Sequence, residues 1–227
     1  MSEKKTVAIA IDGPSGAGKS TIARILAKEL GYIYVDTGAL YRTVGYAVLQ
    51  QNINPKDAES VSAVLPNITV SMGYVEGEQH VFLNGADVNA YIRTPEVSMA
   101  ASAVSAIPKV REFLFHLQQD TARRENVIMD GRDIGTVVLP FADVKIFLTA
   151  SAEERARRRL LELLEKGTNV TYEEVLEDMK VRDYNDSHRA TAPLKPAEDS
   201  KIVTTDGINL EQSVALLKEI ILTSLKG

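Results

Sequence analysis

Short apolar runs alternate with longer amphipathic segments along most of the chain. Five of these runs are rich in β-branched residues and are typical of buried strands: 7–11, 32–35, 127–129, 144–148 and 201–205. Segments such as 19–30 and 39–51 have the spacing of apolar residues that predicts a helix. Buried strands separated by helices favour a parallel sheet covered on both faces. The pattern therefore predicts an α/β fold with a five-stranded parallel sheet flanked by helices.

One region, residues 67–89, departs from this alternation. Two β-rich runs, 68–72 and 80–85, follow one another with Gly73, Gly77 and Gly85 at expected turns. This region predicts a small antiparallel sheet inserted beside the main sheet. A small-residue segment, 96–107, follows it, and a helix is expected from Pro108 to about residue 124.

A second region, residues 151–189, is predicted to be helical. Ser151 to Glu154 has the pattern of a capping box and opens a helix that is expected to reach about residue 166. Thr171 to Glu174 repeats the pattern for a helix that reaches about residue 187. A connection with two prolines follows at 189–196, and an amphipathic helix at 209–225 closes the chain.

Composition limits the classes of protein to consider. The 227 residues suit one sizeable α/β core with an insert. A net charge of −5 argues against a general nucleic-acid surface, and the absence of cysteine excludes disulfides and thiolate metal sites. No apolar run approaches the ~20 residues needed to span a bilayer. We expect a soluble, cytoplasmic protein that binds neither nucleic acid nor membrane, in which local arginines meet any anionic ligand.

The strongest motif follows the first strand. The residues Gly13, Pro14, Ser15, Gly16, Ala17, Gly18, Lys19 and Ser20 fit G-x-x-x-x-G-K-[ST]. Such a loop turns its backbone N–H groups onto a phosphate at a helix N-terminus, while the lysine reaches the β- and γ-phosphates and the serine can ligate Mg²⁺. A glycine-rich turn with a capping serine is the alternative. It leaves the lysine and the preceding strand unexplained, so the motif predicts nucleotide binding.

Further candidates lie where the predicted strands end, which is the ligand edge of a parallel sheet. Polar residues occupy all five of these positions: Asp12, Asp36, Asp130, Thr149 and Asp206. Asp130 either contributes to Mg²⁺ binding through a water or caps the next turn. Arg132 lies in Asp-Gly-Arg-Asp at the same edge, which favours a place in the site.

The remaining arginines allow two interpretations. Arg42, Arg182 and Arg189 either contact phosphate or lie on solvated helix faces with ordinary ion pairs. Residues 155–159 hold four arginines that either form (i, i+4) pairs with Glu153, Glu154 and Glu162 or close over ATP. The three histidines, His80, His116 and His188, have no spacing that suggests a metal site or a catalytic triad.

Six segments together resemble the bacterial cytidylate kinases within the nucleoside monophosphate kinases. They are IDGPSGAGKST near the start, DTGALYR at 36–42, IRTPEVSMAASAVSAIPKVRE at 92–112, MDGRDIGTVV at 129–138, VKIFLTASAEERARRR at 144–159 and RDYNDSHRATAPL at 182–194. The resemblance covers nearly the whole chain. It implies transfer of the γ-phosphoryl group of ATP to CMP or dCMP, with Mg²⁺, by a monomer.

The resemblance also implies a division of the single domain and roles for its residues. The core would be about 1–60, 108–150 and 190–227, the CMP-binding insert about 61–107 and the ATP lid about 151–189. Lys19, Arg42, Arg132 and Arg158 would be catalytic, and residues 13–20 with Thr21 would bind ATP. Thr37, Arg42 and Arg132 would face the CMP phosphate, Arg182 and Asp186 the ribose, and Ser102, Arg111, Asp133 and Arg189 the cytosine. Thr37 stands where the family often has serine, which keeps the hydroxyl. Ser20 stands where many relatives have glycine, which leaves open whether Ser20 or Thr21 is the main hydroxyl near Mg²⁺.

Two other functions remain to be weighed. A P-loop kinase acting on a hydroxyl acceptor would use Asp36 as its general base. A nucleotide-dependent switch would usually read guanine with an N-K-x-D-type element, but no Lys-x-Asp occurs in the chain. The resemblance makes a (d)CMP kinase the principal prediction.

Overall fold

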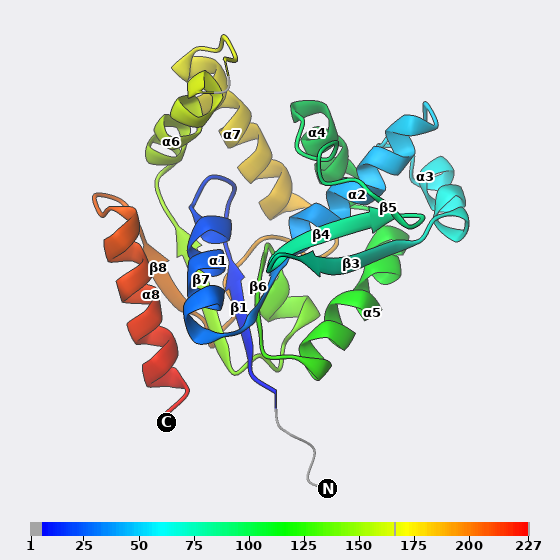
Figure 1. Ribbon diagram of the computed structural model, residues 1–227. Helices are drawn as coiled ribbons and strands as arrows, with labels where there is room; N and C mark the ends of the chain where they lie inside the picture. Colours follow the sequence, from blue (N-terminus) through cyan, green and yellow to red (C-terminus); the bar gives the residue numbers. More distant parts are fainter. Residues whose placement is uncertain (1–5, 166, 227) are drawn as a thin grey trace, which may run out of the picture. The chain divides into compact units, whose positions relative to one another are not determined.

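The computed structural model describes residues 6–165 and 167–226. They form two compact units, unit 1 (residues 6–33, 126–165 and 167–226) and unit 2 (Tyr34–Glu125) (Figure 1). The strands are β1 (Ala8–Asp12), β2 (Ile33–Asp36), β3 (Val70–Val75), β4 (Glu78–Leu83), β5 (Ala86–Asp87), β6 (Val127–Gly131), β7 (Val144–Thr149) and β8 (Lys201–Thr204). The α-helices are α1 (Lys19–Leu30), α2 (Thr37–Gln50), α3 (Ala58–Val64), α4 (Pro95–Val104), α5 (Pro108–Arg124), α6 (Ala152–Glu165), α7 (Tyr172–His188) and α8 (Leu210–Ser224). Two short turns complete the set, the 3₁₀-helix η1 (Leu65–Asn67) and the π-helical η2 (Ile134–Val138).

The main sheet has five strands in the order β2-β6-β1-β7-β8. β1 pairs in parallel with β6 and β7, placing Ile9 beside Ile128 and Ile11 beside Ile146. β7 pairs in parallel with β8. Every residue of β1 and β6 is buried, as expected for strands covered on both faces. The predicted α/β class and five-stranded parallel sheet are confirmed.

In unit 1, α1 and α8 lie side by side on one face of the sheet (Figure 1). Gly31, in the left-handed conformation, ends α1. Asn209 and Gln212 form a capping box at the start of α8. An ion pair between Lys218 and Glu29 (Nζ–Oε2, 2.7 Å) also joins the two helices.

The N-termini of α6 and α7 are capped differently. Thr171 and Glu174 form the predicted capping box at the start of α7. At the start of α6 the box is incomplete: Oγ of Ser151 accepts from the Glu154 N–H at 3.2 Å, but the Ser151 N–H donates to the carboxylate of Asp206 (3.0 and 3.1 Å). The predicted box was wrong because a carboxylate from the loop after β8 supplies the acceptor that Glu154 was expected to supply.

Unit 2 has its own apolar core. α2, α4 and α5 supply residues such as Leu40, Val104 and Leu114, which are fully buried. Gly45 of α2 lies so close to α4 that a Cβ would be 2.9 Å from the backbone nitrogen of Ala101. α2 begins at Thr37, two residues earlier than predicted, because Asp36 caps it.

The predicted antiparallel insert is present as the sheet β3-β4-β5. Its tight turns have left-handed residues at Glu76 and Gly77, and at Asn84 and Gly85. Gly73 was predicted at a turn, but it lies within β3 opposite His80. The ring of Phe82 would lie 3.1 Å from a Cβ there, so the glycine makes room for an aromatic side chain. Within the described residues, no helix is long and apolar enough to cross a membrane.

Candidate active site

The loop between β1 and α1 has the backbone of a phosphate-binding loop. Gly13, Gly16 and Gly18 have φ angles of 149°, 76° and 87°, which side chains rarely allow. A Cβ on Gly13 would lie 1.9 Å from the carbonyl oxygen of Leu148 on β7. The loop therefore passes against the neighbouring strand only because residue 13 is glycine. Gly18 caps α1, whose N–H groups open toward the loop.

Lys19 is buried at the first position of α1. Its Nζ donates a hydrogen bond to the carbonyl oxygen of Pro14 at 2.7 Å, across the loop. Burial lowers the pKa of Lys19 to about 7, and the charge of Arg132 adds to the effect while Asp130 and Asp12 oppose it. A bound polyphosphate would favour the protonated form. We therefore expect Lys19 to take up a proton when an anionic ligand binds.

Ser20 and Asp130 meet at the end of β6. The hydroxyl of Ser20 donates to Oδ2 of Asp130 at 2.8 Å, whereas Thr21 is exposed. Mg²⁺ in phosphate-transfer sites is usually held by one or two protein oxygens and by substrate phosphates. A hydroxyl and a carboxylate at this separation fit that requirement, and the geometry favours Ser20 over Thr21.

Asp12 organises the loop that follows β6. Its two carboxylate oxygens each accept a hydrogen bond of 2.7 Å, from the N–H groups of Ile134 and Gly135 in η2. Burial raises the pKa of Asp12 to about 6, although these two hydrogen bonds act to lower it. The sequence placed Asp12 at the ligand edge, but its carboxylate is committed to holding η2.

Two ion pairs join that loop to other parts of unit 1, one almost fully buried (Arg189–Asp133) and one in which the side chain of Arg132 is 19% exposed. Arg132 donates from Nε to Asp186 of α7 at 2.8 Å, and Arg189 donates from Nη2 to Asp133 at 3.1 Å. Burial alone would raise the pKa of Asp186, but Arg132, Arg182 and Arg189 hold that pKa below its usual value. The structure thus brings together five residues of the predicted CMP set within unit 1. We call them the arginine–carboxylate cluster: Arg132, Asp133, Arg182, Asp186 and Arg189.

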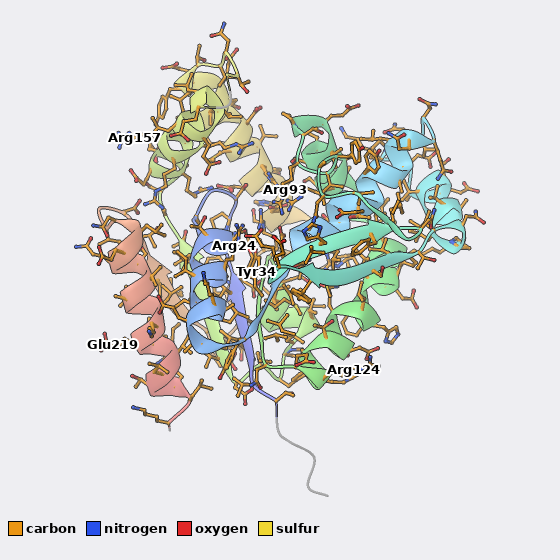
Figure 2. All side chains as sticks on the ribbon, in the orientation of Figure 1. Arg24, Tyr34, Arg93, Arg124, Arg157 and Glu219 are labelled. Atoms are coloured by element: carbon orange, nitrogen blue, oxygen red, sulfur yellow. The ribbon has the colours of Figure 1, made fainter. Side chains whose placement is uncertain are left out.

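In unit 2, Asp36 joins the start of α2 to Arg42. Oδ1 of Asp36 accepts from the N–H of Ala39 at 2.9 Å, and Oδ2 accepts from Nη2 of Arg42 at 2.8 Å. Nη2 of Arg93, a residue labelled in Figure 2, lies 3.7 Å from the same oxygen. Thr37, the first residue of α2, is buried. Two guanidinium groups around one carboxylate leave positive charge at this end of the helix.

Arg111 and Ser102 lie on neighbouring helices of unit 2. Nη1 of Arg111 donates to the carbonyl oxygen of Ser105 at 3.2 Å, and its guanidinium lies 5.6 Å from the ring centre of Tyr41. Oγ of Ser105 in turn donates to the carbonyl oxygen of Ser102 at 2.9 Å. The side chain of Arg111 is therefore buried and held in one orientation.

The arginines of α6 have different environments. Arg158 donates to Oγ1 and O of Thr205 (3.1 and 2.8 Å) and to Glu154 (3.0 Å). The Glu154–Arg158 pair predicted from the spacing is confirmed. Arg157 is 68% exposed in its side chain and points away from the helix pair (Figure 2). Whether any of these residues contacts ATP stays a prediction.

Arg155 has a role that the sequence did not indicate. It is buried, and its guanidinium donates to the carbonyl oxygens of Ala150 (2.9 Å) and Ser15 (3.0 Å) and forms a two-pronged pair with Asp183. It thereby ties α7 to the phosphate-binding loop. The sequence around Arg155 does not indicate that its side chain is buried, because the residues that it contacts are distant in sequence.

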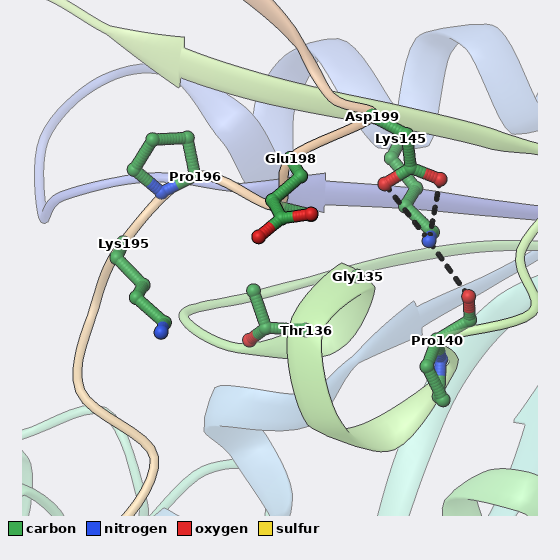
Figure 3. Close-up of a pocket in the computed structure, with 9 residues that line it drawn as sticks. Gly135, Thr136, Pro140, Lys145, Lys195, Pro196, Glu198 and Asp199 are labelled. Atoms are coloured by element: carbon green, nitrogen blue, oxygen red, sulfur yellow. Dashed lines mark hydrogen bonds and ion pairs between the residues drawn. The ribbon is translucent and has the colours of Figure 1, made fainter.

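A separate hollow of about 300 Å³ is lined in part by η2 (Figure 3). Lys145 forms one wall, where its Nζ donates to Asp199 (2.7 and 3.0 Å) and to the carbonyl oxygen of Pro140 (2.7 Å). The other lining residues are Gly135, Thr136, Lys195, Pro196, Ala197 and Glu198. No predicted site residue lines it, so it is distinct from the phosphate-binding loop.

Comparisons with known proteins identify the family. Residues 9–223 match the family model described as cytidylate kinase. The cytidylate kinase of Caldicellulosiruptor bescii is 51% identical over 98% of this chain and 99% of its own, and that of Caldanaerobacter subterraneus is 52% identical over 98% and 97%. An uncharacterized protein from Eubacterium ventriosum has a similar fold, with a TM-score of 0.51 at 11% identity over 95% of this chain and 98% of its own. The chain belongs to the cytidylate kinase family and is a phosphotransferase with a P-loop kinase fold.

Proposed function

We propose that the protein transfers the γ-phosphoryl group of ATP to CMP or dCMP, giving ADP and CDP or dCDP. An oxygen of the acceptor phosphate forms the new bond to the γ-phosphorus, and the bond from that phosphorus to the β–γ bridging oxygen breaks. The arrangement that carries the proposal is the phosphate-binding loop with buried Lys19 next to the arginine–carboxylate cluster of unit 1.

The donor end is assigned to residues 13–21. Backbone N–H groups at the start of α1 bind the phosphates, and Lys19 neutralises charge on the group in transit. Ser20, with Asp130 through a water, would hold Mg²⁺, which when bound supplies further neutralisation of the phosphate oxygens. Arg158 is assigned to closing over ATP, which requires it to release Thr205.

The acceptor end is assigned to arginines, because a phosphate that is already anionic needs no strong general base. Arg132 and Arg42 contact the CMP phosphate, with Thr37 adding a hydroxyl. Arg182 and Asp186 face the ribose. Ser102, Arg111, Asp133 and Arg189 recognise cytosine, whose N4 amino donor suits a carboxylate and whose N3 and O2 suit an arginine.

The hydroxyl-acceptor alternative has less support. Both carboxylate oxygens of Asp36 already accept hydrogen bonds, from Ala39 N and Arg42 Nη2. A substrate hydroxyl would have to displace one of these contacts before Asp36 could accept its proton. The same geometry is suited to fixing Arg42 in place.

A substrate panel tests the proposal. ADP release from ATP and Mg²⁺ is measured with CMP, dCMP, UMP, AMP, GMP, dTMP and shikimate as acceptors. CMP and dCMP should be good substrates and UMP poor. Turnover of shikimate without turnover of any nucleotide would replace the proposal with the hydroxyl-kinase alternative. We further propose that the protein acts as a cytoplasmic monomer on free nucleotides, which size-exclusion chromatography with light scattering tests for the oligomeric state.

A further inference from the structure

Gln79 of β4 forms two hydrogen bonds with the backbone of a single residue, Asp36. Its Oε1 accepts from the Asp36 N–H at 2.6 Å, and its Nε2 donates to the Asp36 carbonyl oxygen at 3.4 Å. One side-chain amide thus pairs with both polar groups of the residue, as the backbone of a neighbouring strand would. Both residues belong to unit 2.

Asp36 is the last residue of β2 and the cap of α2. Its carboxylate reaches in two directions from the backbone that Gln79 holds, to the N–H of Ala39 and to the guanidinium of Arg42. The position of Arg42 therefore depends on the position of the Asp36 backbone. A shift of that backbone would move the carboxylate that holds the guanidinium.

Gln79 is itself anchored on a paired strand. Gln79 lies opposite Tyr74 in the β3–β4 pairing, and its carbonyl oxygen accepts a hydrogen bond from Nδ2 of Asn89 at 3.3 Å. Its Nε2 also lies 3.5 Å from the sulfur of Met72. The amide is thus fixed from its backbone and along its side chain, which makes it a firm support for Asp36.

We infer that Gln79 is a positioning residue for the acceptor phosphate, acting through Asp36 on the guanidinium of Arg42. The inference rests on the proposed function, because it takes Arg42 to contact the phosphate of CMP. Charge-assisted contacts to a reacting phosphate depend steeply on geometry. The antiparallel sheet therefore tunes acceptor binding through one side chain, and the effect does not extend to ATP.

Tyr74 offers a matched control in the same hairpin. Its hydroxyl donates to the carbonyl oxygen of Tyr34, two residues before Asp36, at 3.0 Å. Tyr74→Phe removes a bond between the hairpin and β2 but leaves the Asp36 backbone paired with Gln79. If attachment of the hairpin to β2 were all that mattered, substitutions at Gln79 and at Tyr74 should have equal effects on the kinetics.

Steady-state kinetics of Gln79→Met, Tyr74→Phe and the wild type test the inference. Methionine keeps the length of glutamine and loses both hydrogen bonds, so KM for CMP should rise roughly 10-fold while KM for ATP stays within about 2-fold. Tyr74→Phe should leave both KM values within about 2-fold. Wild-type kinetics in Gln79→Met, equal losses in the two variants, or an equal rise in both KM values of Gln79→Met would each overturn the inference.

A second variant guards against misfolding of the first. Gln79→Asn keeps an amide but is one methylene too short to reach both backbone groups, so it should show the same acceptor-specific rise in KM, with a melting temperature close to that of the wild type. Normal CMP kinetics in a folded Gln79→Asn protein would overturn the inference. A wild-type protein that does not phosphorylate CMP overturns the proposed function and this inference together, whereas an active wild type with an unaffected Gln79→Met overturns the inference alone.

Discussion

Asp133 and Arg189 form an ion pair of 3.1 Å in which the side chains are only 5% and 7% exposed. Both were predicted from the family resemblance to recognise cytosine. The pair shows that at least one oxygen of Asp133 already has a partner, and that the partner is not its sequence neighbour Arg132, which binds Asp186. Asp133 therefore has a structural contribution that is separable from base recognition.

Asp133→Asn should lower the free energy of unfolding by about 3 kcal/mol, because it removes the charge of a carboxylate that pairs with a largely buried guanidinium. It should also lower the CMP:UMP ratio of kcat/KM, since the amide can donate to O4 of uracil. Chemical denaturation and two-substrate kinetics measure the two effects. Asp120→Asn, at an exposed carboxylate paired with the exposed Arg123, is the control and should change neither. An equal loss of both activities would assign Asp133 to structure alone.

Lys19→Met should abolish measurable phosphoryl transfer without lowering the melting temperature at pH 7. The pKa of Lys19 is lowered to about 7 in the folded state, so its burial destabilises the fold fully below pH 7, and the cost declines as the pH rises toward the unfolded pKa of about 10.5. Methionine removes that penalty along with the catalytic charge. Coupled ADP-release assays and thermal melts measure the outcome. Near-normal turnover in the folded variant would contradict the assignment of the whole donor site.

ATP binding at pH 8 should take up close to one proton. Unliganded Lys19, with a pKa of about 7, is mostly neutral at pH 8, and a bound triphosphate favours its charged form. Titration calorimetry in phosphate and in Tris, which differ in ionisation enthalpy, gives the number of protons. The uptake should vanish in Lys19→Met. Equal uptake in the two proteins would place the titrating group elsewhere.

Arg132→Ala and Arg42→Ala should each reduce kcat/KM by roughly 10²-fold or more, as expected when a charge-assisted contact to a reacting phosphate is lost. Lysine at either position should rescue only part of the loss, because it lacks the planar fork. Arg123→Ala is the control, since Arg123 is exposed on α5 and pairs with Asp120. Wild-type kinetics in both alanine variants would assign Arg42 and Arg132 to structural ion pairs.

Gly13→Ala should prevent formation of a working phosphate-binding loop. A Cβ would meet the carbonyl oxygen of Leu148 at 1.9 Å, a backbone atom that cannot move without disturbing β7. Gly31→Ala is the matched control: its φ of 69° is also left-handed, but nothing lies within 4 Å of the added carbon. The control should lose about 1 kcal/mol of stability and keep its activity. Nucleotide-dependent thermal shifts separate the two, and similar shifts in both variants would contradict the steric account.

The sequence predicted what is encoded by neighbouring residues. The strand, the glycine loop and the lysine lie within a dozen positions, so local sequence alone predicts the phosphate-binding loop. Arg155 was missed because its contacts to Ser15 and Asp183 join residues 140 and 28 positions away. The cap of α6 was wrong for the same reason, since Asp206 is 55 residues from Ser151. Periodicity finds an element, but it does not show which side chains from other elements reach its end.

The close approach at Gly45 limits how this enzyme can be engineered for heat resistance. Replacing a glycine inside a helix by alanine is a standard stabilising change, worth up to about 1 kcal/mol through helix propensity. At Gly45 the new methyl group would meet Ala101 N at 2.9 Å and Ala100 Cβ at 3.2 Å, and it would push α4 outward. α4 carries Ser102, which we propose contacts cytosine, so alanine at position 45 should lower both stability and CMP affinity, and the usual gain from helix propensity should not appear.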